Sequence, residues 1–452
     1  MRFLKVLAPV VALSAILLAS LLQYSPIRPI VIDDGTTELP ELRPDVSLDS
    51  VRRALQDRVI GAESFAFDKS TNIVVSGLAD GRVVAFDGNA FRKGGDTDRV
   101  QLDSLVEYPL LSAMSERCEF WKQLTAPVSL DIVDQFELCG RPLGMHFVDD
   151  GLLVYADVGR RAIMQVNVRE RLDEIRAAID AKSDSPSEEL PAPTILTDKC
   201  GGTKLLVPNS VAFKPTDATS GSIFFTESSQ RFPLAELSFE VLDGRYSGRL
   251  CALEYTLEAG ALKLASDVIE IADGIGFANG LVVTDDSHVI VASTTARKML
   301  KYDVSGLAFD ANKKLNAKVL SDNLPGQPDN VRWCVDAGTN AVPTICKAEH
   351  PTILVALGSK YARPFALMHW LKKWPMARQL LSLLPPKLVL ASLPKSAIVA
   401  VIDSVTGELV HTLYAPMHSN SEGVCWLSEA FVVHDTMLLG SFLTPFMGTF
   451  GL

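Results

Sequence analysis

The sequence has no cluster of Lys and Arg that could bind nucleic acid, and its net charge is −11 over 452 residues. Phosphate recognition requires such clusters, so we expect no nucleic-acid partner. The sequence also lacks an alternation of strand and helix patterns, which argues against an α/β fold. No Asn-x-Ser/Thr sequon occurs, so glycosylation gives no indication of the compartment. The 29 Gly and 25 Pro lie between short apolar runs, and this spacing favours an all-β chain.

An apolar segment lies near the N-terminus. Val6–Leu22 carries no charge and follows Arg2 and Lys5. The segment is longer than a usual signal-peptide core and its cleavage pattern is poor, so we expect an uncleaved anchor rather than a cleaved signal peptide. The preceding positive charges predict a single-pass type II membrane protein with its body in the ER lumen or outside the cell. Residues 1–24 are assigned to the cytosolic tip and anchor helix, and residues 25–58 to a stalk and a ring-closing strand.

An oxidising compartment permits disulfides, and the chain has seven Cys. Cys118 and Cys139 flank the loop-like stretch from Leu124 to Glu137. We predict a bridge between them. The alternative is that both thiols are free and buried.

A short apolar strand, opened by a turn and in most copies closed by an acid, recurs six times between residues 59 and 452. The copies begin at Glu63, Leu143, Asn209, Asn279, Asp329 and Glu429. A second apolar strand follows each copy, and a third follows the first five. This pattern predicts a six-bladed β-propeller, with residues before Glu63 closing the ring. Helical patterns are restricted to Glu170–Ala181 and Tyr361–Leu384, and both are interpreted as insertions. The second insertion covers about residues 361–386 and lies in blade five.

The residues that open the six repeats are expected to meet at one end of a central channel. Five of the six carry a side-chain oxygen, where an apolar residue would pack equally well. Asn and carboxylate oxygens without His or Cys suit Ca²⁺. We therefore predict one Ca²⁺ held by Glu63, Asn209, Asn279, Asp329 and Asn330. The alternative is that turn geometry alone selects Asn and Asp at these positions.

Several motifs together resemble the strictosidine synthase-like family, and the resemblance spans about Glu63 to Leu452. They include Gly61-Ala-Glu-Ser-Phe-Ala-Phe-Asp68, Cys139-Gly-Arg-Pro-Leu-Gly144, Phe277-Ala-Asn-Gly280 and Gly440-Ser-Phe-Leu-Thr-Pro-Phe446. The resemblance implies the wider superfamily of paraoxonases and gluconolactonases, which are calcium propellers. It also implies that the five predicted calcium ligands match that superfamily's channel site.

The reaction mechanisms of these relatives do not all apply to this sequence. Paraoxonases carry a His where this chain has Leu143, so their His-assisted hydrolysis is not implied. Strictosidine synthase works without metal and uses a Glu at the position matched by Glu429. The leading hypothesis is a Ca²⁺-dependent hydrolase of aryl esters or lactones, with Glu429 and Asp329 as candidate bases. The alternatives are a non-catalytic binding or adhesion propeller with a structural calcium, and a metal-free acid–base enzyme that uses Glu429.

Three residues are predicted to contact the substrate at the channel mouth: Arg141, Leu143 and Arg231. For the two Arg residues the alternative is a surface or structural ion pair. Beyond the small ester or lactone substrate, the predicted partner is the membrane. The insertion at residues 361–384 combines Trp370 and Trp374 with several Leu and basic residues. Such a stretch is typical of a helix in a membrane interface, and equally of a lid packed over the channel.

Overall fold

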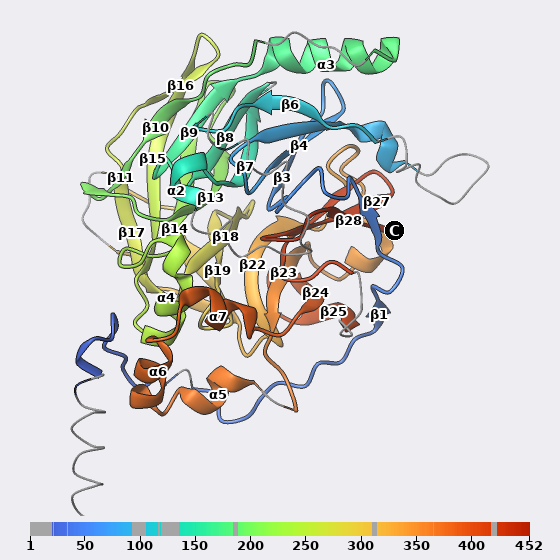
Figure 1. The fold of residues 1–452 in the computed structure, drawn as a ribbon. Coiled ribbons are helices and arrows are strands. Elements are labelled where there is room, and N and C mark those ends of the chain that lie inside the picture. The colour runs from blue at the N-terminus through green and yellow to red at the C-terminus, as the bar shows by residue number, and fades with distance from the viewer. Residues whose placement is uncertain are drawn as a thin grey trace, which may run out of the picture.

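Six antiparallel sheets follow one another around a common centre (Figure 1). The structure, a computed structural model, describes residues 20, 22–33, 35–92, 105–115, 118, 135–149, 151–183, 189–309, 314–364, 366–416 and 423–452. Each sheet is one blade, and its first strand lies innermost. The predicted six-bladed β-propeller is confirmed.

The first three blades account for most of the N-terminal half. Blade one contains β3 (Phe65–Asp68), β4 (Ile73–Gly77), β5 (Val83–Asp87) and β6 (Tyr108–Leu111). Blade two contains β7 (Pro142–Asp149), β8 (Leu152–Asp157), β9 (Ala162–Asn167) and β10 (Thr194–Thr197). A two-stranded sheet, β11 (Lys199–Cys200) and β12 (Thr203–Lys204), precedes blade three. Blade three contains β13 (Pro208–Pro215), β14 (Ser220–Glu227), β15 (Gly248–Glu258), β16 (Ala261–Leu264) and β17 (Ile269–Ile275).

The remaining blades complete the ring. Blade four contains β18 (Ala278–Val283), β19 (His288–Ser293), β20 (Lys298–Asp303) and β21 (Lys318–Ser321). Blade five contains β22 (Gly326–Trp333), β23 (Thr352–Lys360), β24 (Ser396–Asp403) and β25 (Leu409–Pro416). Blade six contains β26 (Leu427–Val433), β27 (Thr436–Ser441) and β28 (Met447–Gly451).

One strand from the N-terminal region closes the ring, as predicted, and a second extends a neighbouring blade. β2 (Arg52–Ala54) pairs antiparallel with β28 and becomes the outer strand of blade six. β1 (Val46–Ser47) pairs parallel with β25 at the edge of blade five. Both edges are thereby covered.

The hydrophobic core is divided among the six interfaces between neighbouring blades. Between blades one and two, for example, Val75 and Leu110 pack in one cluster with Met145 and Tyr155. Five further clusters join the other neighbouring pairs, including blade six to blade one. A blade therefore buries both faces, which is why strands such as β4 are apolar at nearly every position rather than alternating.

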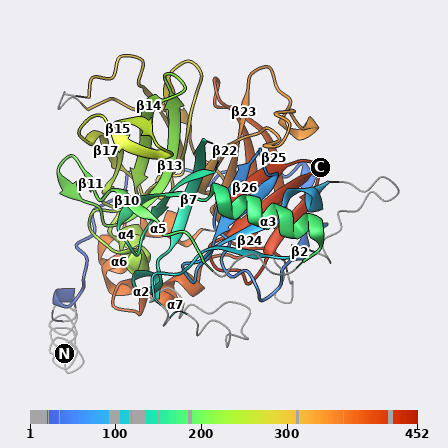
Figure 2. The ribbon, with the colours of Figure 1, turned by 90° about the horizontal axis from the view of Figure 1, so that it is seen from above.

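Short helices extend from the sheets, most of them on one side of the disc (Figure 2). α3 (Arg169–Ala181) covers blade two with Leu172 and Ile175. α2 (Phe136–Cys139) precedes blade two, and α4 (Leu237–Asp243) connects β14 to β15. Three helices connect β23 to β24 in blade five: α5 (Leu367–Leu371), α6 (Pro375–Leu381) and α7 (Pro386–Ala391). They lie where the sequence predicted one helical insertion, whereas the seven-residue α4 was not predicted.

The chain between residues 25 and 44 is not a stalk, which corrects the sequence prediction. Ile27 is fully buried among Phe239, Leu242 and side chains of α5–α7. The Ile32 amide donates to the Lys372 carbonyl at 3.0 Å. These contacts hold the segment against the body.

The predicted anchor helix lies almost wholly outside the described residues. In the ranges that the structure describes, no helix combines the length and the apolar character needed to cross a bilayer.

Three disulfides are present. Cys118 is bonded to Cys139, as predicted. Cys200–Cys251 and Cys334–Cys346 were not predicted, since their partners lie 51 and 12 residues apart without a shared motif. Cys425 is a buried free thiol.

Close approach of inner strands depends on glycine. A Cβ on Gly280 would lie 2.4 Å from Asn330 Cα, across the β18–β22 contact. We expect Gly280→Ala to lower the free energy of unfolding by about 1–3 kcal/mol through overpacking. Chemical denaturation measures the change. Gly306→Ala is the control, because nothing lies within 4 Å of a Cβ there; equal loss in both variants would contradict the prediction.

Candidate functional site

The inner strands share an irregularity at the end where the predicted ligands lie. The pairing register shifts within the first few residues of β7, β13, β18, β22 and β26. A bulge of this kind turns successive side chains away from regular alternation. The irregularities occur next to Asn209, Asn279, Asp329 and Glu429, which places these side chains toward the channel end.

Hydroxyl side chains of the second strands hold the inner strands in place. Thr226 of β14 donates to the Asn279 carbonyl at 2.7 Å. Thr294, just after β19, donates to the Pro328 carbonyl at 2.6 Å. The Asn279 side-chain amide donates in turn to Thr294 Oγ1 at 3.3 Å. Blade three therefore positions the ligand-bearing strand of blade four, and blade four that of blade five.

Four buried acceptor oxygens of the predicted calcium ligands have no hydrogen-bond donor in the described part of the chain. They are Glu63 Oε2, Asn209 Oδ1, Asn279 Oδ1 and Asn330 Oδ1. The second polar atoms of Asn330 and Glu63 are bonded to each other, since Asn330 Nδ2 donates to Glu63 Oε1 at 2.8 Å. A buried acceptor without a partner costs about 1–3 kcal/mol. Four at one channel end are the arrangement that a hard cation would satisfy.

Two carboxyl groups lie with these amides. Burial is the main cause that raises the pKa of Glu63 to about 7; Arg141 opposes this shift, and the nearby Glu429 carboxylate contributes to it. Burial also raises the pKa of Asp329 well above its ordinary value, and Glu63 adds to the effect. These groups repel one another when both are charged, so they favour a cation between them.

Glu429, predicted as a base, is bound by a residue that sequence reasoning missed. Arg332, two positions after Asn330, donates from Nε to Glu429 Oε1 and from Nη2 to Oε2 at 3.2 Å. Its Nη2 also donates to the Phe65 and Met145 carbonyls at 2.9 and 3.2 Å. Glu429 is fully buried, and burial raises its pKa while Arg332 lowers it. The pair joins blades five and six inside the channel.

Arg141 occupies a structural position, which revises its prediction as a substrate contact. The side chain is fully buried and donates to the Gly61 and Phe442 carbonyls at 2.7 and 3.1 Å. Its guanidinium lies over the Phe136 and Phe442 rings. Burial lowers its pKa to about 10, so it remains a cation at neutral pH. Arg141 therefore links the loops of blades one, two and six.

Leu143 belongs to an apolar cluster formed by loops at the same channel end. Its neighbours include Phe277 and Trp426. Trp426, which was not predicted, carries a buried indole N–H that has no acceptor within the described ranges. The carbonyl oxygen of a ligand could accept a hydrogen bond from this indole N–H, which lies beside apolar side chains.

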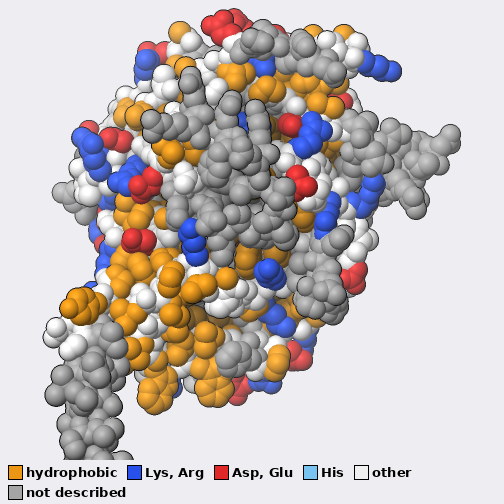
Figure 3. Space-filling view, viewed as in Figure 1, with side chains coloured by type: hydrophobic (Ala, Val, Ile, Leu, Met, Phe, Trp, Pro, Cys, Tyr) orange, Lys and Arg blue, Asp and Glu red, His pale blue; other side chains and the backbone are white. Residues whose placement is uncertain are grey.

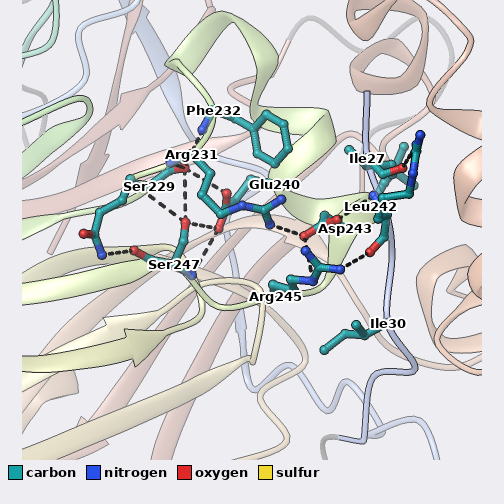
Figure 4. Close-up of polar contacts among 12 residues, drawn as sticks. Ile27, Ile30, Ser229, Arg231, Phe232, Glu240, Leu242, Asp243, Arg245 and Ser247 are labelled. Carbon is teal, nitrogen blue, oxygen red and sulfur yellow. Dashed lines mark hydrogen bonds and ion pairs between the residues drawn. The ribbon is translucent and has the colours of Figure 1, made fainter. Parts of the chain in front are cut away.

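Arg231 pairs with the buried Asp243 of α4 (Figure 4). Its backbone amide donates to Ser229 Oγ at 3.1 Å, and Ser229 donates to Glu240 at 2.8 Å. The guanidinium stacks on Phe232. This network fixes α4 on blade three, which gives Arg231 a structural role; its contact with substrate stays a prediction.

No cluster of three or more His, Cys, Asp or Glu side chains with metal-binding geometry occurs among the residues that the structure describes. The candidate donors are mainly amide oxygens. The donor chemistry and the four unpaired acceptors nevertheless fit Ca²⁺, which accepts Asn oxygens readily.

Known sequences confirm the family resemblance. The sequence model of strictosidine synthase matches residues 215–307. Adipocyte plasma membrane-associated protein from Bos taurus is 24% identical over 434 residues, covering 95% of this chain and 85% of the relative. Protein strictosidine synthase-like 13 from Arabidopsis thaliana is 29% identical over 279 residues, covering 61% of this chain and 56% of the relative.

Solved structures give weaker similarity. A gluconolactonase from Xanthomonas campestris superposes with a TM-score of 0.47 at 15% identity, over 94% of this chain and 97% of that protein. A calcium-binding regucalcin from Agrobacterium tumefaciens superposes with a TM-score of 0.43 at 9% identity, over 92% of this chain and 96% of that protein.

The Arg332–Glu429 pair generates a stability prediction. Glu429→Ala leaves the partly buried Arg332 guanidinium without its carboxylate, and we expect the free energy of unfolding to fall by about 3 kcal/mol. The double variant Arg332→Met/Glu429→Leu removes both charges and should lose less. Denaturant titration of the three proteins gives the comparison. A double variant less stable than Glu429→Ala would contradict the assignment of a mutually neutralising pair.

Proposed function

We propose that this chain is a membrane-anchored, Ca²⁺-dependent hydrolase of aryl esters or lactones. The observation that carries the proposal is the set of four unpaired, buried acceptor oxygens at one end of the channel. A channel end that served only as core would not retain such a set, because each unpaired acceptor destabilises the fold.

The residues that would hold Ca²⁺ are Glu63, Asn209, Asn279, Asn330 and Asp329. Two carboxylates and three amide oxygens supply hard ligands, and waters can fill the remaining positions. Ca²⁺ bound there would supply polarisation of a substrate carbonyl and stabilisation of developing negative charge on its oxygen.

Asp329 is the favoured base. Its side chain is half-buried, so water can reach it. Glu429 is fully buried and receives two hydrogen bonds from Arg332, which hold its oxygens away from proton transfer. We therefore assign water activation to the Asp329 carboxylate and a positioning role to Glu429.

The apolar cluster around Leu143, Phe277 and Trp426 suits an aryl or alkyl group placed beside the carbonyl. The Arg332 contact also weighs against the metal-free alternative, because that mechanism needs a Glu429 carboxyl able to exchange its proton with substrate. A non-catalytic calcium propeller would use the same oxygens, and the experiment below separates it from an enzyme.

The proposed location is a type II membrane protein with the propeller in the ER lumen or outside the cell. Support comes from the apolar run Val6–Leu22 after two basic residues. Relatives carrying the name adipocyte plasma membrane-associated protein are consistent with membrane association.

Hydrolysis of phenyl acetate and a lactone panel by the purified full chain tests the proposal, with Ca²⁺ and after chelation. We expect activity to depend on Ca²⁺. Asn279→Ala should lower Ca²⁺ affinity by about 10- to 100-fold, the effect of one lost contact to a charge. Asn340→Ala is the control, since Asn340 is exposed and bonded to Lys69.

Activity that survives chelation and Asn279→Ala would contradict the proposal. Absence of turnover together with Ca²⁺ binding that raises the melting temperature would favour the non-catalytic propeller.

Ca²⁺ affinity should depend on pH. Glu63 must lose its proton to bind Ca²⁺, and its pKa is about 7. Below that pH the affinity should fall at least about tenfold per pH unit. Without Ca²⁺ the raised pKa of Glu63 means that the folded protein binds the Glu63 proton more tightly than the unfolded chain does. This proton therefore stabilises the fold at low pH, and the stabilisation is lost as the pH rises from the ordinary pKa of 4.5 to about 7. Calorimetry across this range measures the affinity; a flat profile would contradict the role of Glu63.

A further inference from the structure

An exposed apolar surface lies on α5–α7 and the neighbouring N-terminal segment. Its largest members are Val31, Trp370, Trp374, Met376, Leu384 and Leu388. Trp370 and Trp374 are 63% and 67% exposed, and Leu388 is 60% exposed. Figure 3 shows hydrophobic side chains gathered over this part of the molecule. Soluble monomers seldom expose this much contiguous apolar area without a partner.

The charge of this insertion differs from that of the rest of the chain. Residues 361–395 contain six Lys and Arg and no Asp or Glu, although the chain carries a net charge of −11. Lys372 and Arg378 are buried beneath the helices, whereas Lys373 and Lys395 are exposed. Exposed Trp and Leu flanked by Lys are typical of helices that lie in a membrane interface.

The chain that leaves the predicted anchor is fixed against the same helices. Gln379 of α6 donates to the Leu22 carbonyl at 3.0 Å. The hydroxyl groups of Ser25 and Ser382 are 2.8 Å apart. Because Leu22 ends the apolar run, these contacts place the exit of that run beside the exposed apolar surface.

Further contacts make this junction rigid. Arg378 donates to the Leu242 carbonyl at 2.7 Å and to the Ile30 carbonyl. Asp243 accepts from the Arg28 amide at 3.2 Å. Figure 4 shows Ile27 and Ile30 next to Leu242 and Asp243 of α4. The N-terminal segment, α4 and α5–α7 therefore form one unit, named here the helical cap.

We propose that the helical cap seats the propeller directly on the bilayer, with the exposed side chains of α5–α7 in the boundary between headgroups and acyl chains. The occupant of the apolar surface is the lipid interface. Three observations carry this assignment: the exposed Trp and Leu side chains, the absence of acids, and the rigid contact with the exit of the apolar run. The propeller is therefore held at a fixed orientation to the membrane instead of at the end of a flexible tether.

The test uses the full chain reconstituted into vesicles of phosphatidylcholine and phosphatidylserine, with brominated acyl chains as quenchers of tryptophan emission. Interfacial helices bury their apolar face about 5–10 Å below the headgroups. We therefore expect stronger quenching by bromine near the headgroup end of the acyl chain than by bromine near its methyl end. Trp370→Phe/Trp374→Phe should abolish most of this quenching.

Trp333→Phe is the matched control, because Trp333 ends β22 outside the helical cap, and it should leave the quenching unchanged. Both sites are surface or half-buried positions, and an unchanged melting temperature verifies folding. Equal quenching in wild type and the double variant would overturn the proposal. A dimer that covers Trp370 and Trp374 would also overturn the proposal. In that case brominated lipid would not quench the two tryptophans, an aqueous quencher would not reach them, and cross-linking would give a dimer.

Discussion

The structure depends on burial of both faces of every blade, and this is possible only when the ring is closed. Each interface cluster combines side chains of one sheet with side chains of the next. An open ring would expose the faces of two blades at once. The two short strands from the N-terminal region therefore contribute far more to stability than their own hydrogen bonds, because they complete blade six and cover blade five.

The candidate site uses the stability that this packing provides. Glu63, Asn209, Asn279 and Asn330 each keep a buried acceptor without a donor. Such groups oppose folding, and a rigid surrounding ring is what holds them in place. The Arg332–Glu429 pair balances charge deeper in the channel, while the acceptors remain free to bind a cation.

Much of the fold was predictable because repetition makes a weak local pattern recognisable. All six repeats are inner strands, and the closing role of residues before Glu63 followed from the incomplete last blade. The oxygen-bearing positions were predictable for the same reason, since their place within the repeat is shared. The Cys118–Cys139 bridge was suggested by proximity in one loop.

The remaining features depend on tertiary contacts that no local pattern encodes. Arg332 meets Glu429 across 97 residues, and Arg141 meets Phe442 across 301. Residues 25–44 are polar and rich in turns, which resembles a stalk. The burial of Ile27 becomes apparent only when α4 and α5–α7 are present.

Closure by β2 also has a consequence for biosynthesis. β2 is translated before any blade, whereas its partner β28 comes from the last few residues of blade six. During translation β2 therefore has no partner until blade six is made, and the first blade lacks a neighbour on one side. Five interfaces can form in sequence, but the sixth must wait for the end of the chain. Until then unpaired strand edges and apolar faces remain accessible, so the nascent propeller is a natural client for chaperones of its compartment.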